Sequence, residues 1–441
     1  MAGDKLLTSR QSEIYTYMDR DNVSMQPWLE HNQVSGGAGG GALLLMTYTL
    51  LLFLRPHELI EPLTQLHLPL VVMVLMFIVL LSKYSHEIKL SLGQKQPKIV
   101  LALVAIMFLT CFTGYWLGGS IIALKDRVVP VIVIYFIIIC TCHNTAFIKK
   151  LVWLIVIGAF ANDCFAVFDF FDGTHMVMGR LYGRSAGLYG GPNDLAITTC
   201  LIIPFALWLY RISTLKLHKI FLILFVFIAS SAIYLTYSRT GILAAGVMIL
   251  GLIYFSKHRV RLLILWLFIM GVFFVFASER FHDRVVSIVN PDKDEAGARG
   301  ARLDLAAKGV QIFYQHPLTG LGLGNFTIAE GQTHDTGHWK VVHNGYLEVA
   351  TETGIGGFLL FIGLLVSTFT NFVTANRVFR SHDAWREWSL LCNYMLIIFA
   401  MLLLSLFFGS SPYGWILFYV TAFSYICKRE SDNVSERTLA V

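Results

Sequence analysis

One stretch of the chain combines a histidine with two carboxylates at helical spacing. His343 stands directly before an apolar segment, and Glu348 and Glu352 follow it four residues apart. A neutral imidazole near pH 7 can take a proton from a sugar hydroxyl, so we interpret His343 as the candidate catalytic base. Asn344, Glu348 and Asn193 are candidate supporting residues. The two glutamates could orient His343 or contact substrate hydroxyls, or they could be ordinary polar positions at a helix start.

Two arginines at the ends of apolar runs could bind an anion. Arg239 interrupts two apolar runs that almost no loop separates, and an arginine within a membrane span costs about 2.5–3.5 kcal/mol on insertion scales. Arg184 lies in a glycine-rich loop that leads to Pro192 and Asn193 at a predicted helix start. There a guanidinium and the helix dipole could hold phosphate oxygens together. A snorkelling arginine at the membrane interface is the alternative for Arg184.

Arg127 and Arg302 are weaker candidates for the same anion site. Arg127 follows Asp126 and could simply pair with it. Arg302 belongs to segment 299–315, which is predicted to form an amphipathic helix, and a solvated helix face would explain it. The apolar stripe of that helix is predicted to contain Leu303, Ala306, Val310 and Phe313. The glycine-rich turn 320–326 lacks the flanking strand of a nucleotide-binding loop, so we expect exposed amides or close packing there.

Two groups of residues only partly resemble metal sites. His334, His338 and His343 could form a cluster, but the zincin pattern is absent. The run Cys140-Thr141-Cys142-His143 has no second half-site. All seven cysteines lie in apolar segments, so they are interpreted as buried thiols. We therefore expect neither a metal, nor a cofactor, nor a disulfide framework.

Composition and hydropathy indicate the elements that carry these residues. The chain has 441 residues, of which 56% are hydrophobic and 14% charged, and its mean hydropathy is +0.64, unlike a soluble domain. Apolar runs of about 15 to 22 residues fit α-helices that cross a hydrocarbon core. The sequence therefore predicts an all-α polytopic membrane protein in the lipid bilayer, with about twelve transmembrane helices. The predicted spans are 42–55, 66–82, 99–118, 128–142, 150–171, 193–210, 219–237, 240–256, 260–278, 345–374, 389–409 and 411–427.

The basic residues predict the orientation of these spans. With the amino terminus in the cytoplasm, every second loop is cytoplasmic and carries Lys and Arg, as the positive-inside rule requires. The net charge of +6 is spread over these loops and does not indicate a nucleic-acid partner. The opposite face, periplasmic in a bacterium, nevertheless contains arginines that need explaining. These are Arg127, Arg180, Arg184, Arg239, Arg280, Arg284, Arg299 and Arg302.

The predicted domain organisation follows from these spans. The polar first forty residues show no cleavable signal peptide, and the chain is expected to face the cytoplasm at both ends. The predicted parts are a disordered cytoplasmic tail (1–41), a membrane domain of about nine helices (42–278), a large periplasmic loop with the amphipathic helix (279–342), a membrane domain of about three helices (343–427) and a cytoplasmic tail (428–441).

With these residues in place, the chain resembles the O-antigen ligase superfamily of bacterial membrane glycosyltransferases, which includes O-antigen polymerases and protein O-oligosaccharyltransferases. The resemblance covers roughly residues 180 to 375. The segment Leu54-Arg55-Pro56-His57-Glu58, followed by Leu68-Pro69-Leu70, is in addition similar to members linked to exopolysaccharide gene clusters. The matching motifs are Tyr237-Ser238-Arg239-Thr240-Gly241, Arg302 ahead of His316-Pro317-Leu318-Thr319-Gly320-Leu321-Gly322, His343-Asn344 ahead of Gly354-Ile355-Gly356-Gly357, and the Arg184 loop with Pro192-Asn193.

The resemblance implies a twelve-helix bacterial inner-membrane enzyme that performs a metal-independent, inverting glycosyl transfer. The donor would be a glycan on undecaprenyl diphosphate, and the acceptor a hydroxyl of a glycan or of lipid A–core. Arg184 and Arg239 would hold the diphosphate, Arg127 and Arg302 would assist, and His343 would act as the base or position the acceptor hydroxyl. The alternatives are a polymerase, a protein O-oligosaccharyltransferase and a lipid-linked glycan transporter.

Overall fold

The computed structural model describes residues 39–290, 298–332, 340–381, 383–409 and 412–439, so the predicted tail 1–41 lies almost wholly outside it. The described chain is almost entirely helical, and its one small sheet pairs β1 (Met176–Val177) with β2 (Arg180–Leu181) in antiparallel fashion. The helices are α2 Gly40–Leu54, α3 Pro56–Leu59, α4 Glu61–Thr64, α5 Leu68–Lys83, α6 Ser85–Ser91, α7 Lys95–Thr113, α8 Leu117–Ala123, a π-helix Leu124–Val128, α9 Val129–Thr141, α10 Thr145–Asp172, α11 Pro192–Ile212, α12 Lys216–Leu235, α13 Arg239–Tyr254, α14 Arg259–Phe276, α15 Glu279–Val289, α16 Ala298–Gln315, α17 Phe326–Gln332, α18 Gly345–Arg380, a 3-10 helix Asp383–Trp385, α19 Arg386–Phe408 and α20 Trp415–Leu439.

A helix stands at each of the twelve predicted spans. Among the described residues, eight helices are long and apolar enough to cross a membrane, and α2 and α13 are apolar but shorter. The structure therefore confirms an all-α polytopic membrane protein. The eight candidate spans are Glu61–Lys83, Lys95–Thr113, Thr145–Asp172, Pro192–Ile212, Lys216–Leu235, Arg259–Phe276, Gly345–Arg380 and Asp383–Phe408.

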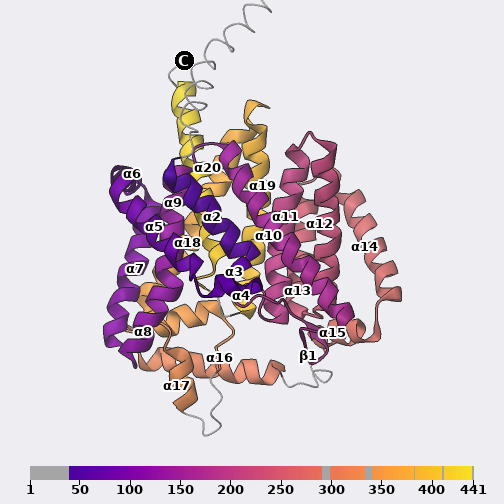
Figure 1. Cartoon of the computed structure of the whole chain (residues 1–441), viewed down its shortest axis with the longest axis horizontal. Coiled ribbons are helices and arrows are strands. Elements are labelled where there is room, and N and C mark those ends of the chain that lie inside the picture. The colour runs from indigo at the N-terminus through magenta and orange to yellow at the C-terminus, as the bar shows by residue number, and fades with distance from the viewer. Residues whose placement is uncertain (1–38, 291–297, 333–339, 382, 410–411, 440–441) are drawn as a thin grey trace, which may run out of the picture.

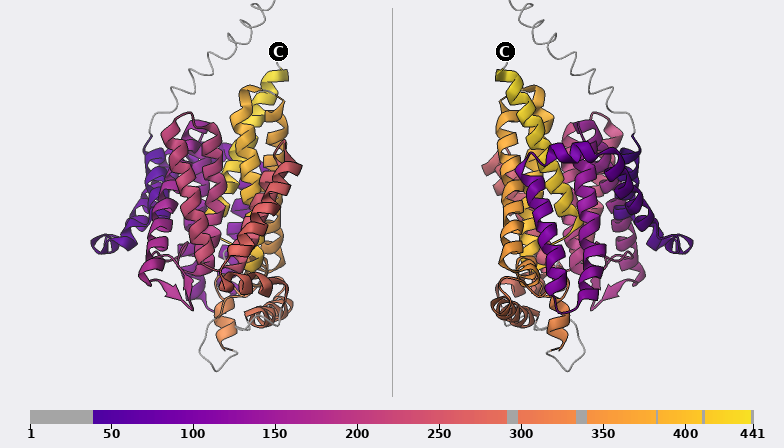
Figure 2. Two further views of the ribbon diagram at one scale, coloured as in Figure 1. Left: turned by 90° about the vertical axis from the view of Figure 1, so that its right-hand side faces the viewer. Right: turned by 90° about the vertical axis from the view of Figure 1, so that its left-hand side faces the viewer.

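The helices form one bundle in which α18 is central. It packs against α7, α19 and α20, while α11 joins this group to α12 and α13 through α19. Helix α14 stands at the edge of the bundle next to α13 (Figure 1). Most of its large apolar side chains are exposed. Such exposed apolar faces suit contact with lipid tails, because the backbone polar groups are already satisfied within the helix. Figure 2 shows α16 crossing one end of the bundle, opposite the end from which α20 projects.

Helix α16 confirms that residues 299–315 are helical, but two residues of its predicted apolar stripe are exposed. Leu303 and Val310 are exposed, whereas Leu305 is buried and Gly309 packs against Leu347 of α18. Arg302 shares this inner face, because residues spaced by three, four and seven lie on one side of a helix. The inward face therefore combines one arginine with small and apolar residues, while Leu303 and Val310 of the predicted stripe face outward.

The glycine-rich turn before α17 docks onto α18 where that helix is interrupted. Gly354 adopts φ 67° and ψ −172°, which breaks the helical hydrogen bonding. The turn supplies replacements, because Leu321 N donates to Thr351 O at 2.8 Å and Gly322 N donates to Glu352 O at 3.1 Å. A Cβ atom on Gly320 would lie 2.3 Å from Glu352 O. Of the two sequence-based explanations for these glycines, close packing is therefore the one that the structure provides.

The carboxy-terminal helix differs from its predicted end. The sequence places a span at 411–427 followed by a cytoplasmic tail, whereas α20 continues to Leu439. An ion pair between Lys428 and Asp432, four residues apart, supports the extension. Arg429 also donates to the carbonyl oxygens of Ile139 and Cys142 at the end of α9, at 2.9 and 2.7 Å. These contacts attach the start of the predicted tail to the bundle.

Candidate functional site

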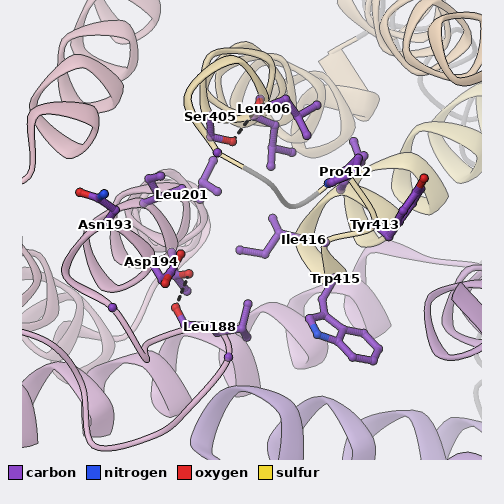
Figure 3. A pocket seen from close by; sticks show the side chains of 18 of the residues that line it. Leu188, Asn193, Asp194, Leu201, Ser405, Leu406, Pro412, Tyr413, Trp415 and Ile416 are labelled. Carbon is purple, nitrogen blue, oxygen red and sulfur yellow. Dashed lines mark hydrogen bonds between the residues drawn. The ribbon is translucent and has the colours of Figure 1, made fainter. Parts of the chain in front are cut away.

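A cavity of about 570 Å³ opens between the start of α11, the start of α18 and the connection from α19 to α20. Figure 3 shows Asn193 and Leu201 of α11 on one side, with Ser405, Leu406 and Ile416 opposite them. The cavity wall thus combines polar and apolar side chains, a combination typical of ligand sites. Four predicted site residues line it: Arg127, Asn193, His343 and Glu348.

Asn193 connects the β1–β2 hairpin to the start of α13. Arg180 Nη2 donates to Asn193 Oδ1 at 2.8 Å, and Ser238 Oγ donates to the same oxygen at 2.8 Å. Arg180 Nε also donates to the carbonyl oxygen of Thr236 at 3.0 Å. Asn193 lies in the first turn of α11, which begins at Pro192. Proline suits the first position of a helix, because the N–H that it lacks would have no acceptor within the helix. An arginine is therefore fixed beside the amino terminus of α11.

The charges of three other arginines act on Arg180. Burial, and then the charges of Arg284, Arg239 and Arg302, lower the pKa of Arg180 to about 10, so it stays protonated at neutral pH. Like charges held together disfavour the charged forms, and a bound anion relieves this repulsion. The four side chains come from β2, α13, α15 and α16, which are far apart in the sequence. This arginine cluster is Arg180, Arg239, Arg284 and Arg302.

Two members of the cluster, Arg239 and Arg302, are predicted site residues, while Arg180 and Arg284 are additions. A sequence signal for both additions exists, since each is an arginine on the face predicted to be poor in basic residues. What the sequence does not contain is their proximity to Asn193 and to one another. Only the folding of α15 and α16 across the end of the bundle brings them together.

Arg184, predicted to bind the anion, is engaged elsewhere in the structure. Its Nε and Nη2 donate to the two carboxylate oxygens of Asp169 at 2.8 and 2.6 Å, and its guanidinium lies 4.9 Å from the ring centre of Phe165. The hydrogen bond to Asp169 raises the pKa of Arg184. Because Asp169 is fully buried at the end of α10, this bidentate pair anchors the loop. Arg184 does not line the cavity.

His343 lies at the mouth of the cavity, two residues before α18 begins. Its backbone has φ 53°, which turns the chain from the α16–α17 region into α18. Burial, and then the positive charge of Arg302, lower the pKa of His343 below its ordinary value of 6.5. The imidazole is therefore neutral at pH 7 and can accept a proton. The charge of Arg302, a member of the arginine cluster, thus acts on both His343 and Arg180.

Arg127 faces Glu348 rather than the predicted partner Asp126. Its Nη1 lies 3.9 Å from Glu348 Oε1, while Asp126 pairs with Lys125 at 3.3 Å. The pair joins an exposed guanidinium to a buried carboxylate at the cavity wall. Asn344 caps α18 by accepting from Leu347 N at 3.0 Å, so its role in the structure is to start the helix that carries Glu348.

The possible metal cluster of His334, His338 and His343 cannot be placed, because the first two lie outside the described residues. Within the described ranges, no group of three or more His, Cys, Asp or Glu side chains is arranged to hold a metal ion. All seven cysteines are free thiols.

The fold and the cavity define a multi-pass α-helical membrane protein with a partly apolar cavity, which is lined by Arg127, His343 and three carboxylates. The residues of the arginine cluster are not part of that lining. Residues 223–362 match the family model described as O-antigen ligase, and this match supports membership of the chain in the O-antigen ligase superfamily. The match runs from α12 into α18 and therefore includes Arg239, Arg284, Arg302 and His343. No curated protein was found to match the chain. The predicted resemblance is thus confirmed, and it indicates an enzyme of the membrane glycosyltransferase type.

Proposed function

We propose that this protein is a metal-independent, inverting glycosyltransferase that moves a glycan from undecaprenyl diphosphate to an acceptor hydroxyl, in the manner of an O-antigen ligase. The observation that carries the proposal is the position of a neutral histidine beside an arginine cluster. His343 and Asn193 line one cavity, and Arg180, bonded to Asn193, is influenced by the charges of Arg239, Arg284 and Arg302. A base and an anion site at adjoining positions are what transfer from a diphosphate donor requires.

In the proposed reaction the acceptor hydroxyl oxygen attacks the anomeric carbon of the donor sugar. The bond from that carbon to the diphosphate oxygen breaks, and both bonding electrons leave with the lipid diphosphate. His343 takes the hydroxyl proton or positions the hydroxyl. The arginine cluster stabilises the negative charge that grows on the leaving diphosphate, which lowers the barrier because the donors are already oriented. Arg127 and Glu348 at the cavity wall would contact acceptor hydroxyls.

Arg184 has a more limited place in this proposal than the sequence predicts. Its guanidinium is held by Asp169, so binding the diphosphate directly would require it to leave a buried carboxylate. We therefore propose that Arg184 orders the loop before α11, while Arg180 occupies the position beside the helix amino terminus. The helix dipole adds to the attraction for the anion there.

The membrane arrangement is part of the same proposal. Twelve helices would span the bacterial inner membrane, with both termini in the cytoplasm and the loop 279–342 in the periplasm. The basic residues of alternate loops support this orientation. The cavity and the arginine cluster would then face the periplasm, where a lipid-linked glycan presents its diphosphate at the membrane boundary.

The test is a transfer assay with purified protein in detergent. The protein is given a lipid-linked repeat unit together with lipid A–core, and the product is followed by mass spectrometry with His343→Ala as the inactive comparison. We expect glycan on lipid A–core and release of the lipid diphosphate from wild type, and neither from the variant. Normal product from correctly folded His343→Ala would remove the assignment of the base.

The same assay distinguishes the proposed function from the alternative functions. A ladder of products from the lipid-linked repeat unit alone would identify a polymerase, which uses the same donor chemistry with a second lipid-linked glycan as acceptor. Transfer to a protein acceptor alone would identify a protein O-oligosaccharyltransferase. Binding of the donor with its glycosidic bond left intact would indicate a transporter.

A further inference from the structure

The short segment between α2 and α4 lies beside the loop that leads into α11. This segment, residues 54–58, includes most of α3, and its Arg55 has the left-handed conformation at φ 53°. The facing loop, residues 183–191, contributes Gly187, Leu188 and Gly191 to the cavity wall. We call these two stretches the 54–58 segment and the cavity loop. They are more than 120 residues apart in the sequence, so their contact is a tertiary feature.

Glu58 connects the two stretches directly. Ala186 N donates to Glu58 Oε2 at 2.8 Å, and Arg55 Nη2 donates to the other carboxylate oxygen, Oε1. Although burial opposes it, these two donors lower the pKa of Glu58, so the carboxylate is charged at neutral pH. A charged acceptor forms a stronger hydrogen bond with a backbone N–H than a neutral one does. One carboxylate thus joins the backbone of the cavity loop to an arginine of the 54–58 segment.

Arg55 also packs against the cavity loop itself. Gly187 has φ 63°, and a Cβ atom at this position would lie 3.1 Å from Arg55 Nη1. The guanidinium therefore lies against the back of a residue whose backbone contributes to the cavity wall. Glycine at this position permits both the left-handed backbone and the close approach of the arginine.

Buried side chains of α10 and the loop support the same contact. Asn162 Nδ2 donates to Phe53 O at 2.8 Å, and its Oδ1 accepts from Ser185 Oγ at 3.0 Å. Tyr189 OH donates to Phe53 O at 3.3 Å. Asn162 thus joins α2, α10 and the cavity loop from within the bundle, while Glu58 holds the same loop from outside.

We propose that Glu58 and Arg55 are positioning residues that hold the cavity loop in the conformation in which the cavity binds the lipid-linked donor. They act through the backbone of Ala186 and Gly187, and through these on the loop that delivers Pro192 and Asn193 to the site. Neither residue lines the cavity. That the cavity binds a lipid-linked donor rests on the proposed function. The contacts by which Glu58 and Arg55 hold the cavity loop, which we call the clamp, do not.

Hydrogen–deuterium exchange of the full-length protein in detergent tests the clamp without any assay of activity. Glu58→Ala removes both hydrogen bonds. Glu58→Gln keeps a neutral acceptor for Ala186 N–H but loses the negative charge that pairs with Arg55. Glu61→Ala is the matched control, because Glu61 is exposed and lies one turn further along. We expect exchange of peptides covering 183–191 to rise about tenfold in Glu58→Ala, less in Glu58→Gln, and not at all in the control.

A kinetic measurement then separates positioning from general stability. Glu58→Ala should raise KM for the lipid-linked donor about tenfold, leave kcat within about twofold, and be partly rescued in Glu58→Gln. Unchanged exchange at 183–191 in Glu58→Ala would overturn the proposal, and so would a rise spread evenly over all helices with no selective change in donor KM. If wild type transfers no glycan, the proposed function fails, and the exchange data alone still decide whether the clamp exists.

Discussion

Arg180 Nη2 lies 2.8 Å from Asn193 Oδ1, so the arginine that reaches the start of α11 is Arg180 and not Arg184 from the adjoining loop. Arg184 instead forms a bidentate pair with Asp169 at the end of α10. The two arginines are four residues apart, yet one stands among like charges and the other beside a buried carboxylate. This difference in partners predicts different consequences when each is removed.

Arg180→Ala should reduce transfer at least 100-fold, far more than any loss of folded protein accounts for. The variant loses the hydrogen bonds to Asn193 Oδ1 and Thr236 O, about 1 kcal/mol each, and relief of the repulsion from the other arginines offsets part of that loss. The anion site loses a donor. The measurement is donor kcat/KM together with the thermal unfolding temperature in detergent. Arg180→Lys should recover only part of the activity, because an ammonium cannot reproduce the forked geometry.

Arg184→Ala should show the opposite pattern. It leaves the carboxylate of Asp169 buried with one fewer donor, although His175 Nδ1 still lies 3.0 Å from it. Because the Arg184 side chain is 35% exposed, the cost is about 1–3 kcal/mol. We therefore expect a clear drop in unfolding temperature, and a loss of activity that follows the loss of folded protein. Full stability combined with complete loss of transfer would return Arg184 to direct diphosphate binding.

The pH dependence of transfer should report the lowered pKa of His343. The reactive form is the neutral imidazole, so kcat/KM should rise as pH increases through a value below 6.5 and stay level above it. Arg302→Gln removes a positive charge that lowers this pKa, so the acidic limb of the profile should move to higher pH. An acidic limb that stays in place in Arg302→Gln would show that another group controls it.

The sequence was sufficient to predict the helices and not sufficient to predict their contacts. Long apolar runs produce helices whatever their neighbours, because an unpaired backbone group is costly in lipid. The pairing of Arg127 with Glu348, in place of Asp126, depends on how α18 is placed against the π-helix Leu124–Val128. No local pattern encodes that placement.

The outward stripe of α16 shows a second limit of the sequence. A periodic apolar face predicts a helix, but it does not say whether protein or another apolar medium covers that face. In the structure Leu303 and Val310 face outward and Leu305 faces α18. The position of Arg302 near His343 follows from this rotation, and it could not be anticipated from spacing alone.

Arg127→Ala should lower transfer while leaving stability nearly unchanged. Its side chain is 57% exposed and its distance to Glu348 is 3.9 Å, so the ion pair contributes less than about 1 kcal/mol. Any activity loss, expected to be about tenfold, would then reflect contact with substrate in the cavity. Lys125→Ala is the matched control, since Lys125 is also exposed and pairs with Asp126 in the same π-helix. Equal effects from both variants would argue against a specific role for Arg127.

Gly354→Ala should destabilise the junction between α18 and the glycine-rich turn. At φ 67° an alanine is strained, and its Cβ would lie 2.5 Å from Leu318 O, so we expect a loss of about 2 kcal/mol or more in the free energy of unfolding. Gly363→Ala in the same helix is the control, because its Cβ would meet only Ile99 Cδ1 at 4.0 Å, and alanine favours helix by up to about 1 kcal/mol. Thermal unfolding in detergent measures both variants.

Because the kink lies between Glu352 and the rest of α18, Gly354→Ala should also shift Glu348 and reduce transfer beyond the loss of folded protein. A fully active and equally stable Gly354→Ala would mean that the turn can dock on a continuous helix, contrary to the hydrogen bonds that Gly322 and Leu321 make with α18.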